Sequence, residues 1–353
     1  MLVQHSSTIN TDGANRSMSD ARMFRSNTSL ASKPTVQPSG GYKRELNKHP
    51  KREVGSPIVT MFTTIRDVHC RKAIHKRLIN NWPALPPGLD PVLFVPFTEH
   101  NSSWISSAIA NNWRVRFLYG LRKNLPILSA MFKEVLALST TPFVGYANAD
   151  LLFDASLIST LRLLSQRLNV SNEKILIVGR RRNVDTAAVN LGSGSDLTKI
   201  SEMEKIGLHQ DNAQDYFIIS RQSVPWNEVP DFVVGRIGYD NWFVSKAQDW
   251  NMTLIDASRT ILAVHQCGID GFNSGWTTVS KESKYMNYWL VKNFNYNRGS
   301  TRFAPFYTKG ECDLRPRLRY PDRCNQIYNM TLNRRTVTPV KRTAKKMVLN
   351  KQT

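Results

Sequence analysis

The sequence lacks a long apolar segment. No run reaches the roughly 18 consecutive apolar residues that indicate a membrane-spanning helix, and no positively charged stretch followed by an apolar one opens the chain. A signal peptide of the usual form is therefore not recognisable. We expect any membrane association to depend on a segment outside these 353 residues.

Cysteine is scarce. The four cysteines are Cys70, Cys267, Cys312 and Cys324, and no two of them are spaced as C-x-x-C. A zinc site is therefore not expected. Cys312 and Cys324 flank a loop rich in proline and arginine, which a disulfide could close in an oxidising compartment. Free thiols explain the same two residues equally well.

Glycine-rich phosphate-binding loops are also missing. Neither G-x-G-x-x-G nor a Walker loop occurs anywhere in the chain. If this protein binds a nucleoside diphosphate, it must therefore hold the phosphates by another device, such as a metal ion together with basic side chains.

Acidic residues are few, with 27 Asp and Glu against 48 Lys and Arg, which gives a formal charge of +21. Such a field attracts nucleic acid, anionic lipid or phosphorylated small molecules. The chain has no helix-turn-helix, zinc-finger or RNP signature, and its basic ends lack interleaved aromatic residues. We expect no nucleic acid partner, and a basic nucleic-acid-binding protein stays as an alternative.

Apolar periodicity is lost at both ends of the chain. Residues 1–55 are rich in small polar and basic residues, which predicts a disordered tail or stem. Residues 333–353 carry Lys and Arg without an acidic residue, which predicts a second, basic flexible tail. Between them, residues 56–332 form one expected domain, and 41% hydrophobic content over the chain suffices for a substantial core.

Six Asn-x-Ser/Thr sequons occur, at Asn15, Asn27, Asn101, Asn169, Asn251 and Asn329. In a chain rich in these residue types, chance explains such triplets about as well as N-glycosylation does. If the sequons are used, the protein is a glycoprotein of the Golgi or ER lumen.

Apolar runs alternate with helical patterns through the central region. This order is typical of a mostly parallel sheet with helices on its faces, and we therefore predict an α/β fold. The expected strands lie at 58–65, 92–97, 115–119, 143–150, 175–178, 216–219 and 261–264, and the expected helices at 70–80, 103–111, 125–138, 155–168 and 241–248.

The most informative run is Phe143–Asp150, where a short apolar strand ends in Asn148 and Asp150. Oxygen-bearing side chains at the carboxyl end of a strand suit a hard divalent cation that carries phosphate. An Asn/Asp turn after a strand is the alternative. Arg180 follows the expected strand at 175–178 and could contact a diphosphate, although an exposed strand exit explains most of the Arg180–Arg182 triplet.

A series of segments carries a family resemblance. It resembles the nucleotide-sugar glycosyltransferases of the GT-A fold, in particular a branch with a G-R-x-G-[WY]-D-N-W block, over roughly residues 57–270. The segments are Tyr146–Phe153, Val178–Arg181, Asp215–Ile218, Gly235–Trp242, Leu254–Ala257 and Val264–Gln266.

The resemblance implies a transferase that uses Mn²⁺ or Mg²⁺ and a nucleoside diphosphate sugar. Asn148 and Asp150 stand in the place of its D-x-D motif, where an amide replaces the first acid and keeps hydrogen bonding at the cost of charge. Asp150 and His265 are the implied metal ligands, and Asp256 could orient His265. A histidine that only caps a strand is the alternative reading of His265.

Asp240 is the candidate catalytic base, because it lies in a glycine-bracketed loop before Trp242, where burial would raise its pKa. An N-cap of the helix at 241–248 is the alternative. Asp215 and Arg236 are candidates for contacts with the donor sugar and the diphosphate, and turn or loop-bracing roles explain them equally well.

The predicted function is transfer of a sugar to a glycan, glycoprotein or other hydroxyl acceptor, with an inverting or a retaining course left open. A sugar-nucleotide-binding protein without turnover is the alternative that Asn148 suggests. Several aromatic residues near the end of the domain could form an acceptor wall, but we expect most of them to pack in the core. These residues are Trp276, Tyr285, Tyr288 and Trp289.

Overall fold

The structure is a computed structural model, and it describes residues 55–66, 71–186, 191, 197, 199–200, 207–267, 280–291, 294–310 and 313–317. The two expected tails, apart from Gly55, lie outside the described residues, and so do Cys70, Cys312, Cys324 and Trp276. The tails and the disulfide therefore stay predictions. Within the described part, none of the helices combines the length and apolar character that a membrane crossing requires.

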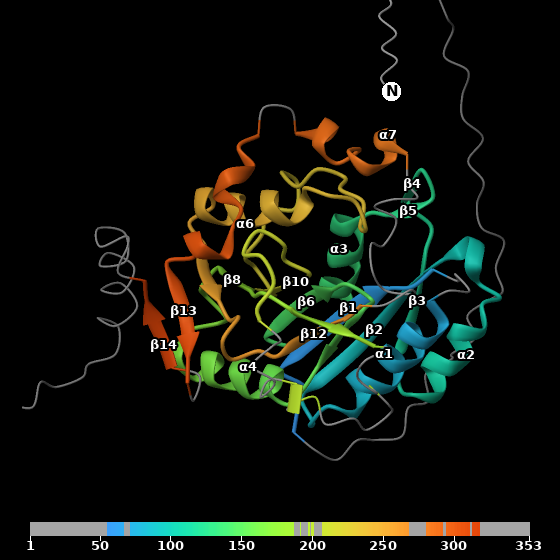
Figure 1. Cartoon of the computed structure of the whole chain (residues 1–353), viewed down its shortest axis with the longest axis horizontal. Coiled ribbons are helices and arrows are strands. Elements are labelled where there is room, and N and C mark those ends of the chain that lie inside the picture. Colours follow the sequence, from blue (N-terminus) through green and yellow to red (C-terminus); the bar gives the residue numbers. More distant parts are fainter. Residues whose placement is uncertain are drawn as a thin grey trace, which may run out of the picture. The chain divides into compact units, whose positions relative to one another are not determined.

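A nine-stranded sheet forms the centre of the domain, in the order β14-β13-β11-β8-β10-β6-β1-β2-β3 (Figure 1). Neighbouring strands run parallel, except that β10 is antiparallel to β6 and β8, and β14 is antiparallel to β13. The carboxyl ends of β1, β2, β6 and β8 therefore meet at one edge of the sheet. In α/β proteins that edge is where ligands bind.

The strands of this sheet are β1 (Val59–Thr64), β2 (Leu89–Pro96), β3 (Arg114–Leu118), β6 (Phe143–Ala147), β8 (Ile175–Val178), β10 (Tyr216–Ser220), β11 (Thr253–Asp256), β13 (Phe306–Lys309) and β14 (Asp313–Pro316). The α-helices are α1 (Lys72–Ala84), α2 (Ser103–Ala110), α3 (Leu128–Leu138), α4 (Ser156–Arg167), α6 (Tyr239–Asp249) and α7 (Lys281–Lys284). Short 3₁₀ helices are η2 (Phe97–Glu99), η3 (Tyr288–Leu290), η4 (Tyr296–Arg298) and η5 (Thr301–Phe303).

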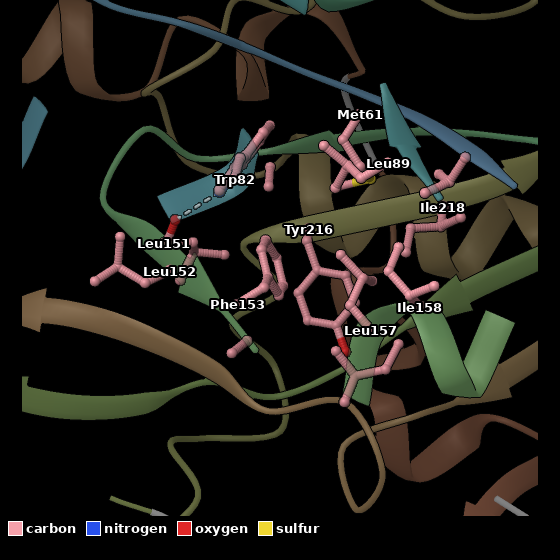
Figure 2. Close-up of a cluster of buried hydrophobic side chains, with 14 of the residues drawn as sticks. Met61, Trp82, Leu89, Leu151, Leu152, Phe153, Leu157, Ile158, Tyr216 and Ile218 are labelled. Atoms are coloured by element: carbon pink, nitrogen blue, oxygen red, sulfur yellow. Dashed lines mark hydrogen bonds between the residues drawn. The ribbon is translucent and has the colours of Figure 1, made fainter. Parts of the chain in front are cut away.

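Helices cover both faces of the sheet because successive strand residues point to opposite sides. Met61 of β1 joins a core with residues of α1, α2 and α4, whereas Phe62 joins a second core with residues of α3 and α6. Trp82 of α1 is fully buried in the first core, where its indole N–H donates to the Leu151 carbonyl at 3.1 Å (Figure 2). This bond ties α1 to the segment that follows Asp150.

The segment after Asp150 is an edge strand of a small second sheet, which has the order β7-β12-β9. The sheet consists of β7 (Leu151–Phe153), β12 (Ala263–Cys267) and β9 (Arg182–Asp185). His265 is paired with Leu151 across the antiparallel β7–β12 ladder and with Asn183 across the parallel β12–β9 ladder. The register of this sheet therefore brings the segment after β6 against the segment that carries His265.

The predicted α/β class, with a mostly parallel mixed sheet and helices on both faces, is confirmed. The helix expected from Leu125 begins instead at Leu128, because Leu125–Pro126 (β5) pairs with Leu121–Arg122 (β4) in a hairpin. The strands β7, β9, β13 and β14 are short, and apolar periodicity did not reveal them.

Three of the sequon asparagines, Asn101, Asn169 and Asn251, fall within the described residues, and all three are exposed. Their accessibility is the property that glycosylation needs. The Golgi or ER lumen remains a prediction.

Candidate active site

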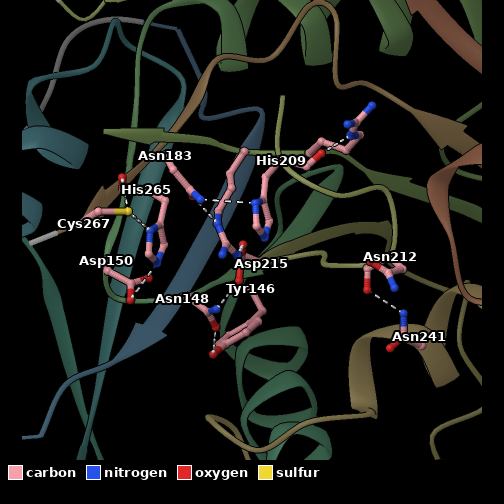
Figure 3. Close-up of polar contacts among 12 residues, drawn as sticks. Tyr146, Asn148, Asp150, Asn183, His209, Asn212, Asp215, Asn241, His265 and Cys267 are labelled. Carbon is pink, nitrogen blue, oxygen red and sulfur yellow. Dashed lines mark hydrogen bonds and ion pairs between the residues drawn. The ribbon is translucent and has the colours of Figure 1, made fainter. Parts of the chain in front are cut away.

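The structure brings Asp150 and His265 together at the carboxyl end of β6. The main-chain N–H of Gln266 donates to the Asp150 carbonyl at 3.0 Å. This contact continues the β7–β12 register and places the two side chains face to face. His265 Nε2 lies 3.4 Å from Asp150 Oδ2, and the two side chains are only 10% and 6% exposed (Figure 3).

The two groups hold each other in their charged forms. Burial alone would raise the pKa of Asp150, but the charge and the hydrogen bond of His265, together with two nearby arginine cations, outweigh burial and lower the pKa to about 2. Burial alone would lower the pKa of His265, and the Asp150 carboxylate reverses this and raises it to about 10. The cation of Arg71 also favours the ionised Asp150.

The pair fits part of a metal site. Asp150 Oδ1 is buried and has no hydrogen-bond partner among the described residues, and a carboxylate oxygen with a neutral imidazole nitrogen suits Mn²⁺ or Mg²⁺. A cation would therefore take the place of the proton that His265 carries in the pair. Within the described residues, no group of three or more His, Cys, Asp or Glu side chains gathers as a complete protein cage. A cation here would need further ligands from phosphate and water, as is usual for Mg²⁺ at phosphate sites.

Cys267 adds a contact on the far side of the imidazole. Its sulfur lies 3.2 Å from His265 Nδ1, and it is buried with a free thiol. The interaction fixes the ring orientation of His265, which is the role usually given to a partner behind a histidine ligand. Asp256, the partner suggested by sequence, pairs instead with Arg317 at 2.7 Å.

Asn148 is engaged on every side by protein groups. Its Nδ2 donates to Asp215 Oδ1 at 2.7 Å, and its Oδ1 accepts from the Tyr146 hydroxyl at 2.8 Å (Figure 3). The same oxygen accepts from the Tyr239 hydroxyl at 3.3 Å. The amide thus bridges β6, the start of β10 and the start of α6. Both of its functions, donor and acceptor, are used, which a carboxylate could not reproduce.

Asp215 is held by two partners. Besides Asn148, it forms an ion pair with Arg181, and these two side chains are 15% and 12% exposed. Arg181 also donates from Nε to Asn183 Oδ1 at 2.8 Å, and Asn183 lies 3.2 Å from His209 Nδ1. Burial, and then the charge of Arg181, lowers the pKa of His209. The network is therefore continuous from Asn148 to His209.

Arg180 contacts the main chain at one end of this network. Its guanidinium donates to the carbonyls of Leu208 and His209, and its main-chain N–H donates to Ser258 Oγ at 2.8 Å. It braces the segment before β10, and Arg181 is the arginine of the triplet that contacts the candidate site residues. The contact of Arg180 with a diphosphate stays a prediction.

Asp240 lies in the first turn of α6, half-buried. The N-cap is Gly238, in the left-handed region at φ 101°, so the capping role suggested for Asp240 is wrong. Burial raises the pKa of Asp240 to about 6; facing backbone N–H groups oppose this rise, and the nearby Asp215 carboxylate adds to it. A carboxyl with this pKa is partly protonated near neutral pH and suits proton transfer.

Arg236 braces the loop before α6. Its Nε donates to Ser283 Oγ at 3.0 Å and its Nη1 to the Gly235 carbonyl at 2.8 Å. Asn287 reinforces the same contact, because its fully buried amide bonds the main chain of Val233 at 3.0 Å in both directions and the Arg236 carbonyl at 3.2 Å. The loop is thereby fixed to α7 and η3.

Aromatic residues line an open cavity of about 860 Å³ beside this loop. Trp289 is 66% exposed and Tyr285 and Tyr288 are half-buried, so the expectation that these residues pack in the core is wrong. The segment is too short to bury both faces, since α7 has four residues and η3 three. The lining residues are Lys281, Glu282, Tyr285, Tyr288, Trp289, Val291, Phe294 and Tyr296.

Sequence reasoning missed four contributors, Tyr146, Asn183, His209 and Cys267. Tyr146 stands two residues before Asn148 on one strand, and the period of two places such residues on the same face. That signal could have found it. Asn183 and His209 sit in polar segments with no periodicity, and only the long-range pairing of β9 with β12 brings Asn183 into place.

No protein-family model matches the chain, and no curated protein matches it. Solved structures do match in part. Glucosyl-3-phosphoglycerate synthase from Mycobacterium tuberculosis, solved with Mg²⁺ and UDP, is 12% identical, with a TM-score of 0.35 over 60% of this chain and 72% of that one. A mannosyltransferase from Pyrobaculum calidifontis, solved with GDP-Man and Mn²⁺, is 11% identical, with a TM-score of 0.40 over 64% and 62%.

A third match, a mycobacterial protein, is 12% identical with a TM-score of 0.34, over 60% of this chain. The matched parts span 65% of that protein and 62% of the mannosyltransferase, which is less than two thirds of each. These likenesses are partial. The α/β assignment is carried by the strand order and the register given above.

Proposed function

We propose that the protein transfers a glycosyl group from a nucleoside diphosphate sugar to a hydroxyl acceptor, with Mn²⁺ or Mg²⁺ as cofactor. The observation that carries the proposal is the convergence of Asp150 and His265 at the carboxyl end of β6, with one buried Asp150 oxygen left unpartnered among the described residues. Asp150 and His265 would hold the cation. When bound, such an ion stabilises the negative charge of a leaving diphosphate.

The chain's own residues supply the rest of the chemistry. Asp240 takes the proton of the acceptor hydroxyl while that oxygen bonds to the anomeric carbon of the donor sugar. The bond from the anomeric carbon to the diphosphate oxygen breaks, and the nucleoside diphosphate leaves with the electron pair. This assignment describes an inverting reaction, and the anomeric configuration of the product distinguishes it from a retaining one.

The remaining network positions these groups. Asn148 and Arg181 hold Asp215 in place, and burial, with the negative charge of Asp215 in addition, keeps the pKa of Asp240 high. In this proposal Arg180 and Arg236 brace the loops on either side, and Arg71 balances the charge of Asp150. A base with an elevated pKa accepts a proton more strongly than an ordinary aspartate does.

Asp150→Asn tests the proposal. We expect the variant to lose the thermal stabilisation that UDP or GDP gives in the presence of Mn²⁺, and to lower Mn²⁺-dependent hydrolysis of the sugar nucleotide by at least about 100-fold. Asp249→Asn is the matched control, because Asp249 is a surface carboxylate paired with Lys246 and Arg298. Hydrolysis that continues unchanged in a correctly folded Asp150→Asn protein would contradict the metal site.

A sugar-nucleotide-binding protein without turnover is the second candidate, and the complete engagement of Asn148 with protein partners favours it. It predicts nucleotide stabilisation in the wild-type protein with no release of sugar. A nucleic-acid-binding protein predicts stabilisation by an oligonucleotide and by no nucleotide. The same experiment therefore separates the three functions.

A further inference from the structure

Two tyrosines form a wall between two neighbouring cavities. Tyr288 of η3 and Tyr296 of η4 stack with their ring centroids 4.3 Å apart and their planes at 30°. Both residues line the aromatic cavity of about 860 Å³ and a second cavity of about 610 Å³. We call this pair the tyrosine wall. A ligand that contacts both of its sides would occupy both cavities.

The aromatic cavity offers flat apolar surfaces that the protein leaves uncovered. Trp289 is 66% exposed, and Tyr285 meets Tyr288 edge to face at 5.7 Å. Exposed aromatic surface gathered in a hollow marks a binding groove more often than it marks ordinary surface. One face of a pyranose ring presents mainly C–H groups, and these pack on aromatic rings as other apolar groups do.

The second cavity is polar instead. Its lining supplies amide, carboxylate, hydroxyl and guanidinium groups, which match the hydroxyls of a sugar. Asn241 of α6 is among them, and its Nδ2 donates to the Asn212 carbonyl at 2.8 Å (Figure 3). The lining residues are Gln210, Asp211, Asn212, Asn241, Tyr288, Tyr296, Ser300 and Arg302.

Charges balance within each cavity. The aromatic cavity contains Lys281 and Glu282, and the polar cavity contains Asp211 and Arg302. A site for a phosphorylated acceptor would gather uncompensated positive charge. The balance therefore favours a neutral ligand. The volumes lie within or near the roughly 300–1,000 Å³ typical of small-molecule sites, so together they have room for more than one sugar ring.

The tyrosine wall touches the backbone that carries Asp240. A Cβ atom at Gly238 would lie 2.9 Å from a Tyr288 ring carbon and 3.3 Å from a Tyr296 ring carbon, which only glycine avoids. The polar cavity is lined by Asn241, the residue after Asp240. The Tyr296 hydroxyl is buried without a hydrogen-bond partner among the described residues, which leaves one group at the wall for a ligand.

We propose that the two cavities form one acceptor site for a neutral oligosaccharide. One sugar ring packs on Trp289 and Tyr285, and the next sugar places its hydroxyls in the polar cavity, which is lined by Asn241, the residue after Asp240. The inference rests on the proposed function, from which it takes the use of a hydroxyl acceptor beside Asp240.

Binding of the full chain to an array of immobilised neutral oligosaccharides tests the site, with lactose, cellobiose, maltose and N,N′-diacetylchitobiose as soluble competitors. We expect the wild-type protein to be retained, and Trp289→Ala to bind at least about 10-fold more weakly, as truncation of a central aromatic contact does. Tyr119→Ala is the matched control, because Tyr119 is an aromatic residue that is 74% exposed, stacks on Phe97 and lines neither cavity. It should bind like the wild type.

Two results would overturn the inference. The first is that the array retains the wild-type and Trp289→Ala proteins equally, or retains neither of them, while thermal denaturation shows that both are folded. The other is displacement by glycerol 3-phosphate and by no neutral sugar, with loss of that binding in Arg302→Ala, which would show a phosphorylated acceptor. Because Trp289 is largely exposed, its truncation leaves the core intact.

Wild-type nucleotide binding separates this inference from the proposed function. If UDP and GDP with Mn²⁺ stabilise the protein but no oligosaccharide binds, the acceptor site is wrong and the donor site stands. If oligosaccharides bind in a Trp289-dependent manner but no nucleotide does, the saccharide site stands and the transferase function is wrong.

Discussion

The two sides of the candidate site are built in opposite ways. We call the side with Asp150, His265, Asn148 and Asp215 the β6 edge, and its polar groups are almost all paired with one another. On the other side, the tyrosine wall lines a cavity, and Trp289 beside it is largely exposed. A preorganised polar network suits charge stabilisation, because its dipoles need no reorganisation during reaction. Uncovered aromatic surfaces suit recognition of a variable neutral ligand.

The energetic consequences of this difference are distinct. At the β6 edge, removing one partner strands another buried polar group, which costs about 1–3 kcal/mol. At the exposed Trp289 a truncation removes contact area and little of the fold's stability. Asp240 is the residue that connects the two sides. Burial and then the charge of Asp215 raise its pKa, and it stands two residues after Gly238 at the tyrosine wall.

Replacement of this connecting carboxylate should therefore change activity most. We expect Asp240→Asn to lower transfer by about 100- to 10,000-fold, the usual contribution of a positioned acid or base. In the wild type the rate should fall as the pH drops below about 6, because Asp240 then becomes protonated. The measurement is the pH profile of transfer from the sugar nucleotide. A flat profile between pH 5 and pH 8 would remove Asp240 from the chemistry.

The same Asp240→Asn variant should lose activity but gain stability. The pKa of Asp240 is raised in the folded protein, so the fold binds its proton more tightly and loses stability as the pH rises from about 4 to about 6. The introduced amide cannot ionise, and so Asp240→Asn should unfold at a higher temperature than the wild type at pH 8, with no gain at pH 4. Equal melting temperatures of the wild type and the variant at both pH values would show that burial does not destabilise the ionised Asp240.

The sequence was sufficient to predict the parts of this site that depend on strand ends. Asp150 follows an apolar strand, and the rule that ligand groups gather at the carboxyl ends of parallel strands predicts its place at the edge of the sheet. His265 lies within β12 of the second sheet, so its convergence with Asp150 was predicted from the resemblance alone, and the β7–β12 ladder produces it. The metal role of the two residues stays a prediction.

Other features depend on contacts that local pattern does not encode. The segment Arg182–Asp185 is polar and lacks alternation, yet it becomes β9 because β12 supplies its ladder. Trp289 departs from the rule that large aromatic residues are usually buried, because two short helices leave one face of the segment open. The sequence also could not show whether Arg180 or Arg181 contacts Asp215, because adjacent residues after a strand point in different directions.

Asn287 tests how firmly the tyrosine wall is tied to the loop before α6. We expect Asn287→Ala to cost about 2–3 kcal/mol of unfolding free energy, because it strands the N–H and the carbonyl of Val233 and the carbonyl of Arg236. Urea denaturation measures the loss. Asn111→Ala is the control, since Asn111 makes one side-chain bond, to the Ser107 carbonyl, and should cost less than about 1 kcal/mol. Equal losses in the two variants would mean that the wall does not depend on this amide.

Asn148→Asp tests whether the fold requires the amide at the β6 edge or whether a carboxylate there would bind a cation better. The introduced carboxylate cannot donate to Asp215 Oδ1, where the amide nitrogen now lies at 2.7 Å, and it faces a like charge. We therefore expect a loss of about 1–2 kcal/mol at pH 8 by urea denaturation, with part of it regained at pH 5, where a protonated acid donates again. Asn172→Asp, at an exposed position, should change little. A stabilised Asn148→Asp protein with tighter Mn²⁺ binding would show instead that this position faces the cation and that the bridge to Asp215 is incidental.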